Sequence, residues 1–181
     1  MDIYLVVKFL HVVCAVVWLG GGFALLLLAS VQATKAEPGR ILVIVSQVAY
    51  LGPRLFMPAS VLTLLTGLGA VYLGAFGWPA WVVPGLSGIA VTALLGALKL
   101  GPMSGRVVAL AKAKGADTAL PGAMAIIRLA RFDYVMQFSI VFLMVAKPDW
   151  QDLAVLGLPA LAVLLAGFIT IRPAKIRATN P

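Results

Sequence analysis

The chain has 181 residues, of which 62% are hydrophobic and 11% charged, and its mean hydropathy is +1.07. Because soluble domains carry about a quarter charged residues, this composition excludes the soluble class and indicates an integral membrane protein. The net charge of +8 does not indicate nucleic-acid binding, since basic residues in loops beside membrane spans follow from insertion topology and anionic lipid.

Five apolar segments follow one another, and each is long enough to cross a hydrocarbon core that needs roughly 20 helical residues. The predicted spans are residues 3–31, 55–76, 82–100, 124–146 and 153–171, within one membrane domain of residues 1–181. The predicted fold class is therefore all-α, a polytopic transmembrane helical bundle.

Two stretches between the spans need separate predictions. The apolar piece at 41–52 is short for a span, so we expect it to lie in the interface, to re-enter the membrane, or to extend the second span as a kinked helix. The stretch at 106–122 is rich in Lys, Gly and small residues and is predicted to be a polar loop before the fourth span.

Loop charges predict the orientation of the five spans. One side carries most of the basic residues, namely Lys35, Arg40, Arg106, Lys112, Lys114, Arg172, Lys175 and Arg177. The other side carries Lys147 beside Asp2, Asp149 and Asp152. Because basic loops stay in the cytoplasm, we expect the N-terminus outside and the C-terminus inside.

The first span contains polar groups that are unusual in hydrocarbon. Helical spacings of three and four place Tyr4, Lys8, His11 and Trp18 on one stripe, with Cys14 at its edge. At about 1.5 Å per residue, the histidine lies about 12 Å below the outer end of the span, whereas the lysine can snorkel outward. We therefore expect the imidazole of His11 to face a partner inside the bundle.

Three uses of His11 stay open at this point. It can make a structural hydrogen bond between helices, it can ligate haem or another metal, or it can carry protons near neutral pH. If haem is bound, Met144 and Met136 in the fourth span are candidate sixth ligands through their thioether sulfur, although such methionines also serve as ordinary packing. Intramembrane polar residues are functional candidates by default.

A second group of charges is predicted near the other side of the membrane. It comprises Arg54, Lys99, Arg128 and Arg131, with Asp133 entering the fourth span. In one interpretation these side chains flank the spans and pair locally, with Asp133 bound to Arg131 or Arg54. In the other they line a positive pocket for an anionic group, such as a haem propionate or a lipid headgroup.

The chain resembles an uncharacterised family of bacterial integral membrane proteins catalogued as domain of unknown function 2269. The resemblance rests on the stretches "YLVVKFLHVVCAVVWLGGGF" and "SIVFLMVAKP", which begin at Tyr4 and Ser139. It covers most of the chain and implies a multi-pass protein of the bacterial cytoplasmic (inner) membrane.

More distantly, the chain is similar to the HemJ-type protoporphyrinogen oxidase and to copper-resistance-D-like membrane proteins. The shared features are Lys8-x-x-His11, Trp18-x-Gly20, "PRLFMPASVLTLLTGL", Gly105-Arg106 and "VFLMVAKP". This resemblance implies a b-type haem held by a histidine of the first span, which maps to His11. The chain departs from it at Lys99, which stands too close to Gly105 to match the family's lysine, and in lacking the further histidines.

Three functions follow as hypotheses. The first is a haem b-associated redox protein in which His11 is the axial ligand, Lys8 neutralises a propionate, Trp18 packs on the macrocycle, and a quinone or porphyrin-like molecule is the partner. The second is a non-catalytic subunit or assembly factor, in a homo-oligomer or a larger complex, that packs through small residues such as Gly20, Gly21 and Gly22. The third is a small metal or ion transporter.

Overall fold

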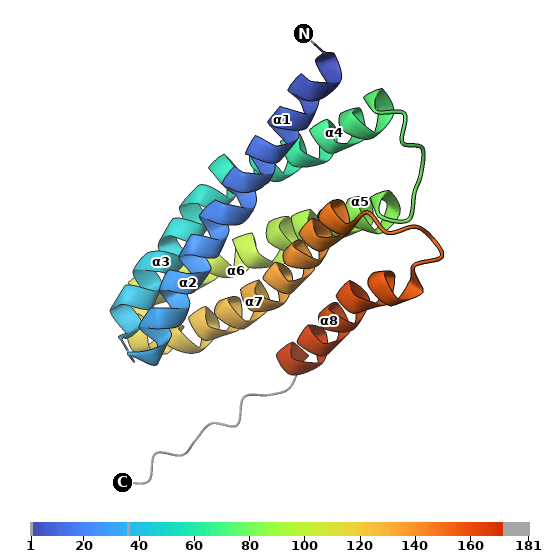
Figure 1. The fold of residues 1–181 in the computed structure, drawn as a ribbon. Helices are drawn as coiled ribbons and strands as arrows, with labels where there is room; N and C mark the ends of the chain where they lie inside the picture. Colours follow the sequence, from blue (N-terminus) through green and yellow to red (C-terminus); the bar gives the residue numbers. More distant parts are fainter. Residues whose placement is uncertain (1, 36, 172–181) are drawn as a thin grey trace.

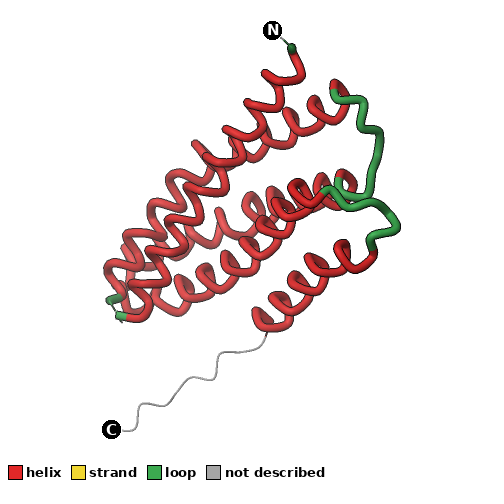
Figure 2. The backbone as a smooth tube through the Cα atoms, viewed as in Figure 1, coloured by secondary structure: helices red, strands yellow, loops and turns green. Residues whose placement is uncertain are grey.

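The computed structural model describes residues 2–35 and 37–171. These residues form an all-α bundle with five long apolar helices, each of a length and composition that can cross a membrane. The predictions of fold class and of five candidate spans are confirmed, and the chain is a multi-pass membrane protein (Figure 2). Three of the five helices contain a wider π-helical turn partway along.

The elements of the described chain run in the order α1 (Ile3–Ala15), η1 (Val16–Gly20), α2 (Gly21–Thr34), α3 (Pro38–Leu51), η2 (Gly52–Phe56), α4 (Met57–Leu73), α5 (Val82–Leu95), η3 (Gly96–Leu100), α6 (Gly101–Lys114), α7 (Ala116–Ala146) and α8 (Leu153–Ile171). Each π turn is continuous with the helices on both of its sides. Residues 41–51 lie in α3, which continues through η2 into α4, so this apolar piece is the first half of one long second helix.

Successive long helices run antiparallel, which gives the bundle two ends (Figure 1). We call the end with Ile3 and the loops 74–81 and 147–152 the N-terminal side, and the end with Lys35 and Gly115 the hairpin side. In Figure 1, α8 lies on the outside of α7, and among the described elements it makes its extensive contacts with α7 alone. Its Gly167 faces the ring of Phe132 on α7.

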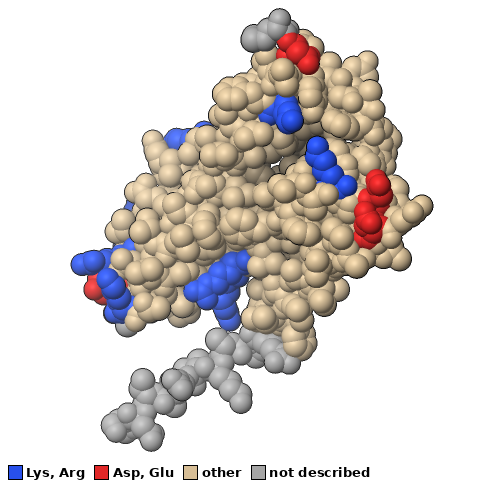
Figure 3. Space-filling model, in the orientation of Figure 1, with Lys and Arg blue, Asp and Glu red and all other residues tan. Residues whose placement is uncertain are grey.

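Charged side chains are sorted between the two ends, as Figure 3 shows, with lysines and arginines gathered toward the hairpin side. Within the described residues, the basic side chains predicted for one side are exposed, namely Lys35, Arg40, Arg106, Lys112 and Lys114. Arg172, Lys175 and Arg177 lie outside the described residues. The described basic residues thus lie at the end of the bundle to which the sequence assigns them. The orientation of that end in the membrane stays a prediction.

The stretch predicted as a polar loop at 106–122 is helical on both sides of a single residue. Gly115, with φ of 89°, is the turn between α6 and α7, a conformation that glycine adopts without a steric penalty. Ala119 and Ala123 are fully buried, and a Cβ on Gly122 would stand 2.7 Å from Val107 of α6. Close packing of these small residues keeps the segment helical despite Pro121.

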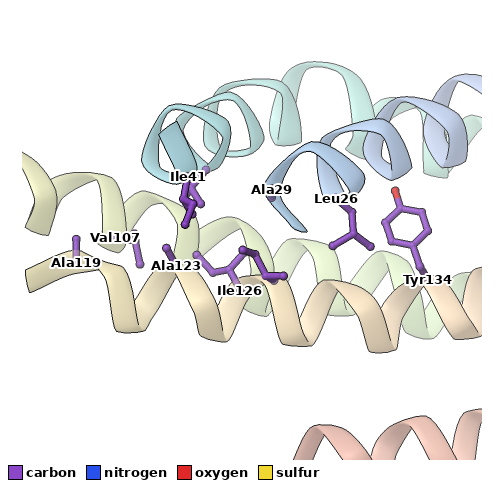
Figure 4. Packing of buried hydrophobic residues seen from close by; sticks show 10 residues of the cluster. Leu26, Ala29, Ile41, Val107, Ala119, Ala123, Ile126 and Tyr134 are labelled. Atoms are coloured by element: carbon purple, nitrogen blue, oxygen red, sulfur yellow. The ribbon is translucent and has the colours of Figure 1, made fainter. Parts of the chain in front are cut away.

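The buried core lies mainly in the half of the bundle toward the hairpin side. Figure 4 shows Ile41, Val107, Ala123 and Ile126 packed between α3, α6 and α7. By contrast, α1 has no buried residue and lies against α4. The two halves therefore differ: one is a compact four-helix core, and the other holds the α1–α4 pair, in which α1 packs closely on α4 but stays on the outside of the bundle.

Candidate functional site

Three π-helical turns from three different spans meet inside the bundle. The turns η1, η2 and η3 lie within the first, second and third long helices, and each locally widens its helix. The middle turn, η2, contacts both of the others. In η2 and η3 the bond runs to a carbonyl five residues back, from Met57 N–H to Gly52 and from Gly101 N–H to Gly96. Because π-helix is well under 1% of protein structure and often marks functional sites, their convergence singles out this region.

A cavity of about 350 Å³ adjoins the three turns. Its wall is built from the first four spans and includes Trp18 of η1, Gly52 and Phe56 of η2, and Gly96 of η3. On α7 the lining runs from Ile126 to Gln137, a helical length of about 16 Å at 1.5 Å per residue. The cavity is therefore elongated along the bundle, toward the hairpin side.

The most unusual residues of the wall are an acid and an amide one helical turn apart on α7. Asp133 and Gln137 are only 5% and 3% exposed, and Gln137 Nε2 donates a hydrogen bond of 2.7 Å to Asp133 Oδ2. The other oxygen of each side chain, Asp133 Oδ1 and Gln137 Oε1, is buried with no partner among the described residues. A buried oxygen without a partner is disfavoured by roughly 1–3 kcal/mol, so this pair needs an explanation.

The hydroxyl groups of the wall already donate their hydrogens to the protein. Tyr134 Oη donates to the carbonyl of Leu19 at 3.3 Å, Ser60 Oγ to Met57 at 2.8 Å, and Thr92 Oγ1 to Ile89 at 3.1 Å. The oxygens of all three hydroxyls can still accept a hydrogen bond. The donors left on the wall are the indole N–H of Trp18 and one amide hydrogen of Gln137.

His11 belongs to a different place, the contact between α1 and α4. Its Nδ1 lies 2.8 Å from the carbonyl oxygen of Thr63 and 3.4 Å from Thr66 Oγ1, and its ring rests on Gly67, where a Cβ would stand 2.9 Å from Cε1. A carbonyl only accepts, so we assign the proton of the neutral ring to Nδ1. The expectation that the imidazole faces a protein partner is confirmed.

The residues predicted to hold a haem with His11 are not brought together. Lys8 is exposed, and its Nζ lies 5.7 Å from the ring centroid of Tyr4. Trp18, which lies in η1, lines the cavity, whereas His11 does not and instead faces α4. Met144 packs into the space left by Gly85 of α5, and Met136 is half-buried on α7.

The four basic residues of the predicted second group also lie apart from the cavity wall. Arg54 is exposed, donates a hydrogen bond of 3.2 Å to the carbonyl of Tyr50 and stacks on the Tyr50 ring. Arg131 is also exposed and donates a hydrogen bond of 3.2 Å to Ser30 Oγ. Lys99 is exposed in η3, and Arg128 is half-buried on α7.

The predicted local pairing of Asp133 with Arg131 or Arg54 is wrong. Within the described residues, the carboxyl bonds to Gln137 instead. The physical reason is the helical face: residues two apart on a helix point in different directions, so on α7 Asp133 faces Gln137 inside the bundle, whereas Arg131 is exposed and bonds to Ser30.

Sequence reasoning missed Gln137, Ser60 and Thr92, and it placed Asp133 at a membrane boundary. One signal could have found the pair, since Asp133 and Gln137 are separated by four residues in an apolar segment and so share a helical face. The two hydroxyl residues carry no comparable signal, because serine and threonine in spans commonly bond to their own helix. The cavity itself depends on how four spans pack.

Comparison with known proteins gave no matching protein family, no matching characterised protein and no matching solved structure. The family resemblance of the residues around His11 therefore stays a prediction. The geometry of the cavity and of the His11 contact is what bears on function.

Proposed function

We propose that this protein is a membrane-embedded binding protein that holds a small, largely apolar molecule in the cavity beside the three π turns. The observation that carries the proposal is the buried Asp133–Gln137 pair: both residues line that cavity, and each has one buried oxygen without a partner among the described residues. A volume of about 350 Å³ falls within the range of small-molecule sites, which are typically apolar with a few placed polar groups.

A purely structural bundle explains these features less well. Helices in lipid associate through close packing, and protein interiors contain few voids larger than a water molecule. Replacing Asp133 and Gln137 by apolar side chains would fill space and remove two unpartnered oxygens, so packing alone favours other residues here. A bound molecule that contacts these atoms would offset their unfavourable burial.

The test uses the cavity tryptophan as a reporter. Trp78, Trp81 and Trp150 are replaced by phenylalanine, which leaves Trp18 as the sole energy donor to a neutral fluorescent probe, anthracenemethanol, in phosphatidylcholine nanodiscs. We expect saturable energy transfer, because the probe has an apolar body suited to the wall.

A matched pair of variants tells cavity binding from partition into lipid. A Cβ at Gly96 or at Gly157 meets no atom within 4 Å, but only Gly96 lines the cavity. Gly96→Leu should fill the cavity and abolish the saturable signal, whereas Gly157→Leu on α8 should leave it unchanged. Equal signals from the two variants would refute the proposal.

A second candidate is the haem b-associated redox function with His11 as axial ligand. The hydrogen bond from Nδ1 to the Thr63 carbonyl favours it, since metal-ligating histidines are commonly oriented by such a bond and Nε2 is left as the basic nitrogen. If haem b is bound, it would supply one-electron chemistry, for a quinone or a porphyrin-like partner. The described contacts of Lys8 and Met144 are with Tyr4 and Gly85 rather than with the ring, so His11 alone supports this candidate.

An absorption spectrum tests the second candidate. The protein is expressed with ample haem and purified beside a His11→Ala variant. A Soret band that is present in the parent and lost in the variant would favour haem ligation. Its absence from both proteins would leave His11 with its structural hydrogen bond, which is also the role expected for a non-catalytic subunit.

For the membrane orientation, we propose the N-terminal side outside and the hairpin side in the cytoplasm of a bacterial inner membrane. The basic residues of the hairpin side support it. Single cysteines are introduced at Asp149 and Lys112 in a Cys14→Ser background and treated with a membrane-impermeant maleimide on intact cells. Labelling at 149 and protection at 112 are expected, and the reverse pattern would contradict the orientation.

A further inference from the structure

We infer that the cavity takes an organic ammonium cation, a primary amine on an apolar body, whose N–H groups bind the free oxygens of Asp133 and Gln137. The inference rests on the proposed function and names the chemical class of the molecule. It is carried by the hydrogen-bonding capacity, the charge and the aromatic content of the wall.

The wall of the cavity is rich in acceptors. Asp133 Oδ1 and Gln137 Oε1 are unpartnered among the described residues, and the hydroxyls of Ser60, Thr92 and Tyr134 have already donated their hydrogens. A ligand that pairs with these oxygens must bring hydrogens of its own. A primary ammonium brings three N–H donors and no acceptor, which matches such a wall.

Charge points to the same class of ligand. The described residues that line the cavity include one acidic side chain, Asp133, and no lysine, arginine or histidine. The other titratable group on the wall is Tyr134, whose hydroxyl is bonded to the Leu19 carbonyl. An isolated carboxylate at this depth must be neutralised by a proton or by a cation, and no basic side chain among the described lining residues supplies a cation. An anionic ligand would meet an uncompensated acid.

Aromatic and apolar groups define the rest of the molecule. Trp18, Phe56 and Tyr134 line the cavity, and aromatic faces attract ammonium groups most strongly where water is excluded. Beyond Asp133, the lining on α7 continues with Ala130, Ile127 and Ile126 toward the hairpin side. This apolar length suits a hydrocarbon body, whereas a metal ion would need a full shell of oxygens and would leave most of the cavity unfilled.

Three probes of one size test the inference in the single-tryptophan protein. Anthracenylmethylammonium, anthracenemethanol and anthracenecarboxylate share a ring system and differ in charge. In phosphatidylcholine nanodiscs, energy transfer from Trp18 gives the dissociation constant of each. We expect the ammonium to bind at least about tenfold tighter than the alcohol, which corresponds to about 1.4 kcal/mol, and the carboxylate to bind weakest.

The variant Asp133→Asn removes the charge and keeps the acceptor for Gln137 Nε2. It should reduce the affinity for the ammonium at least about tenfold, and reduce the affinity for the alcohol by a clearly smaller factor because the alcohol carries no charge. Asp149→Asn, an acid in the loop 147–152, is the matched control and should change neither affinity.

The outcomes separate this inference from the proposed function. If all three probes bind equally and Gly96→Leu still abolishes binding, the cavity binds small molecules but the ammonium inference is overturned. It is likewise overturned if sodium displaces the ammonium probe at constant ionic strength, since the site would then prefer a metal ion. If no probe responds to Gly96→Leu, the proposed function fails first.

Discussion

Two polar sites of this bundle, one half-buried and one buried, differ in the hydrogen bonds that the protein offers them. At the α1–α4 contact, the described partners of His11 Nδ1 are the Thr63 carbonyl at 2.8 Å and, more weakly, Thr66 Oγ1. At the cavity, Asp133 and Gln137 bond to each other and leave one oxygen each without a partner among the described residues. The sequence draws attention to the first site, and the second is the one with a cavity.

The difference teaches how to read polar residues inside a membrane. A group whose hydrogen bond is complete within the protein already has a structural reason to be there, since it joins two helices. A group that is buried and incomplete is unfavourable for folding, so its presence requires a role that packing does not provide. By this criterion the cavity is the better functional candidate, whereas the hydrogen bond of His11 to Thr63 already gives that residue a structural reason to be there.

The largest expected effect comes from forcing the His11 ring off α4. A Cβ at Gly67 would stand 2.9 Å from His11 Cε1 and 3.2 Å from Nδ1, so Gly67→Val should displace the ring and lower the free energy of unfolding by about 3 kcal/mol. Reversible denaturation in mixed micelles would measure it. Gly157→Val, where no atom lies within 4 Å, is the control, and an equal loss in both variants would count against a tight contact at Gly67.

The next largest effect should be a gain in stability, because the Asp133–Gln137 pair leaves two buried oxygens without hydrogen bonds among the described residues. Replacing both residues, Asp133→Leu with Gln137→Leu, removes two unpartnered oxygens and should raise the free energy of unfolding by about 2 kcal/mol while abolishing ammonium binding. The same denaturation measurement applies. The single change Gln137→Leu should raise the free energy of unfolding less, because it leaves Asp133 Oδ2 without its donor. A double variant that is less stable than the parent would contradict the distinction drawn between the two sites.

A smaller loss is expected from His11→Leu, which removes the hydrogen bond to Thr63 but keeps an apolar side chain. Hydrogen bonds between membrane helices average below 1 kcal/mol, so we expect the free energy of unfolding to fall by about 1 kcal/mol. His11→Gln carries a donor and should retain most of the stability. Neither change should alter probe binding in the cavity, and a change in that affinity would show that the two sites are coupled.

The smallest effect is expected at Thr66. Its hydroxyl lies 3.4 Å from His11 Nδ1, which is long for a hydrogen bond, and it also donates to the carbonyl of Leu62 in its own helix. Thr66→Val should therefore change the free energy of unfolding by less than about 0.5 kcal/mol. A loss as large as that of His11→Leu would assign the ring's main bond to the hydroxyl rather than to the Thr63 carbonyl.

The five spans and the inward direction of the His11 side chain could both be predicted from the sequence. Both depend on strong local signals, long apolar runs in the first case and one polar ring at membrane depth in the second. The bounds of the helices at the hairpin side could not be predicted, because Gly115 and Pro121 are ordinary loop signals. There the burial of Ala119 and Ala123 against a neighbouring helix overrides the local preference.

The candidate site was harder to predict than the fold. Asp133 closely follows Arg131 in the sequence, so pairing with that residue or with Arg54 was the natural expectation. The structure instead turns the carboxyl toward Gln137, on a different face of α7 from Arg131. The π turns have no distinctive composition, although Pro53 in η2 lacks an N–H and so favours a break in the ladder. A cavity formed by four spans is a long-range property that no single segment encodes.

A π turn is an α-helix that has accepted one additional residue without breaking. Homologous chains in which Val16–Gly20, Gly52–Phe56 or Gly96–Leu100 is regular α-helix are therefore expected to align with this one through a one-residue gap at that position. Such gaps, in the middle of spans that otherwise align without gaps, would show which homologues gained or lost each π turn, and in what order.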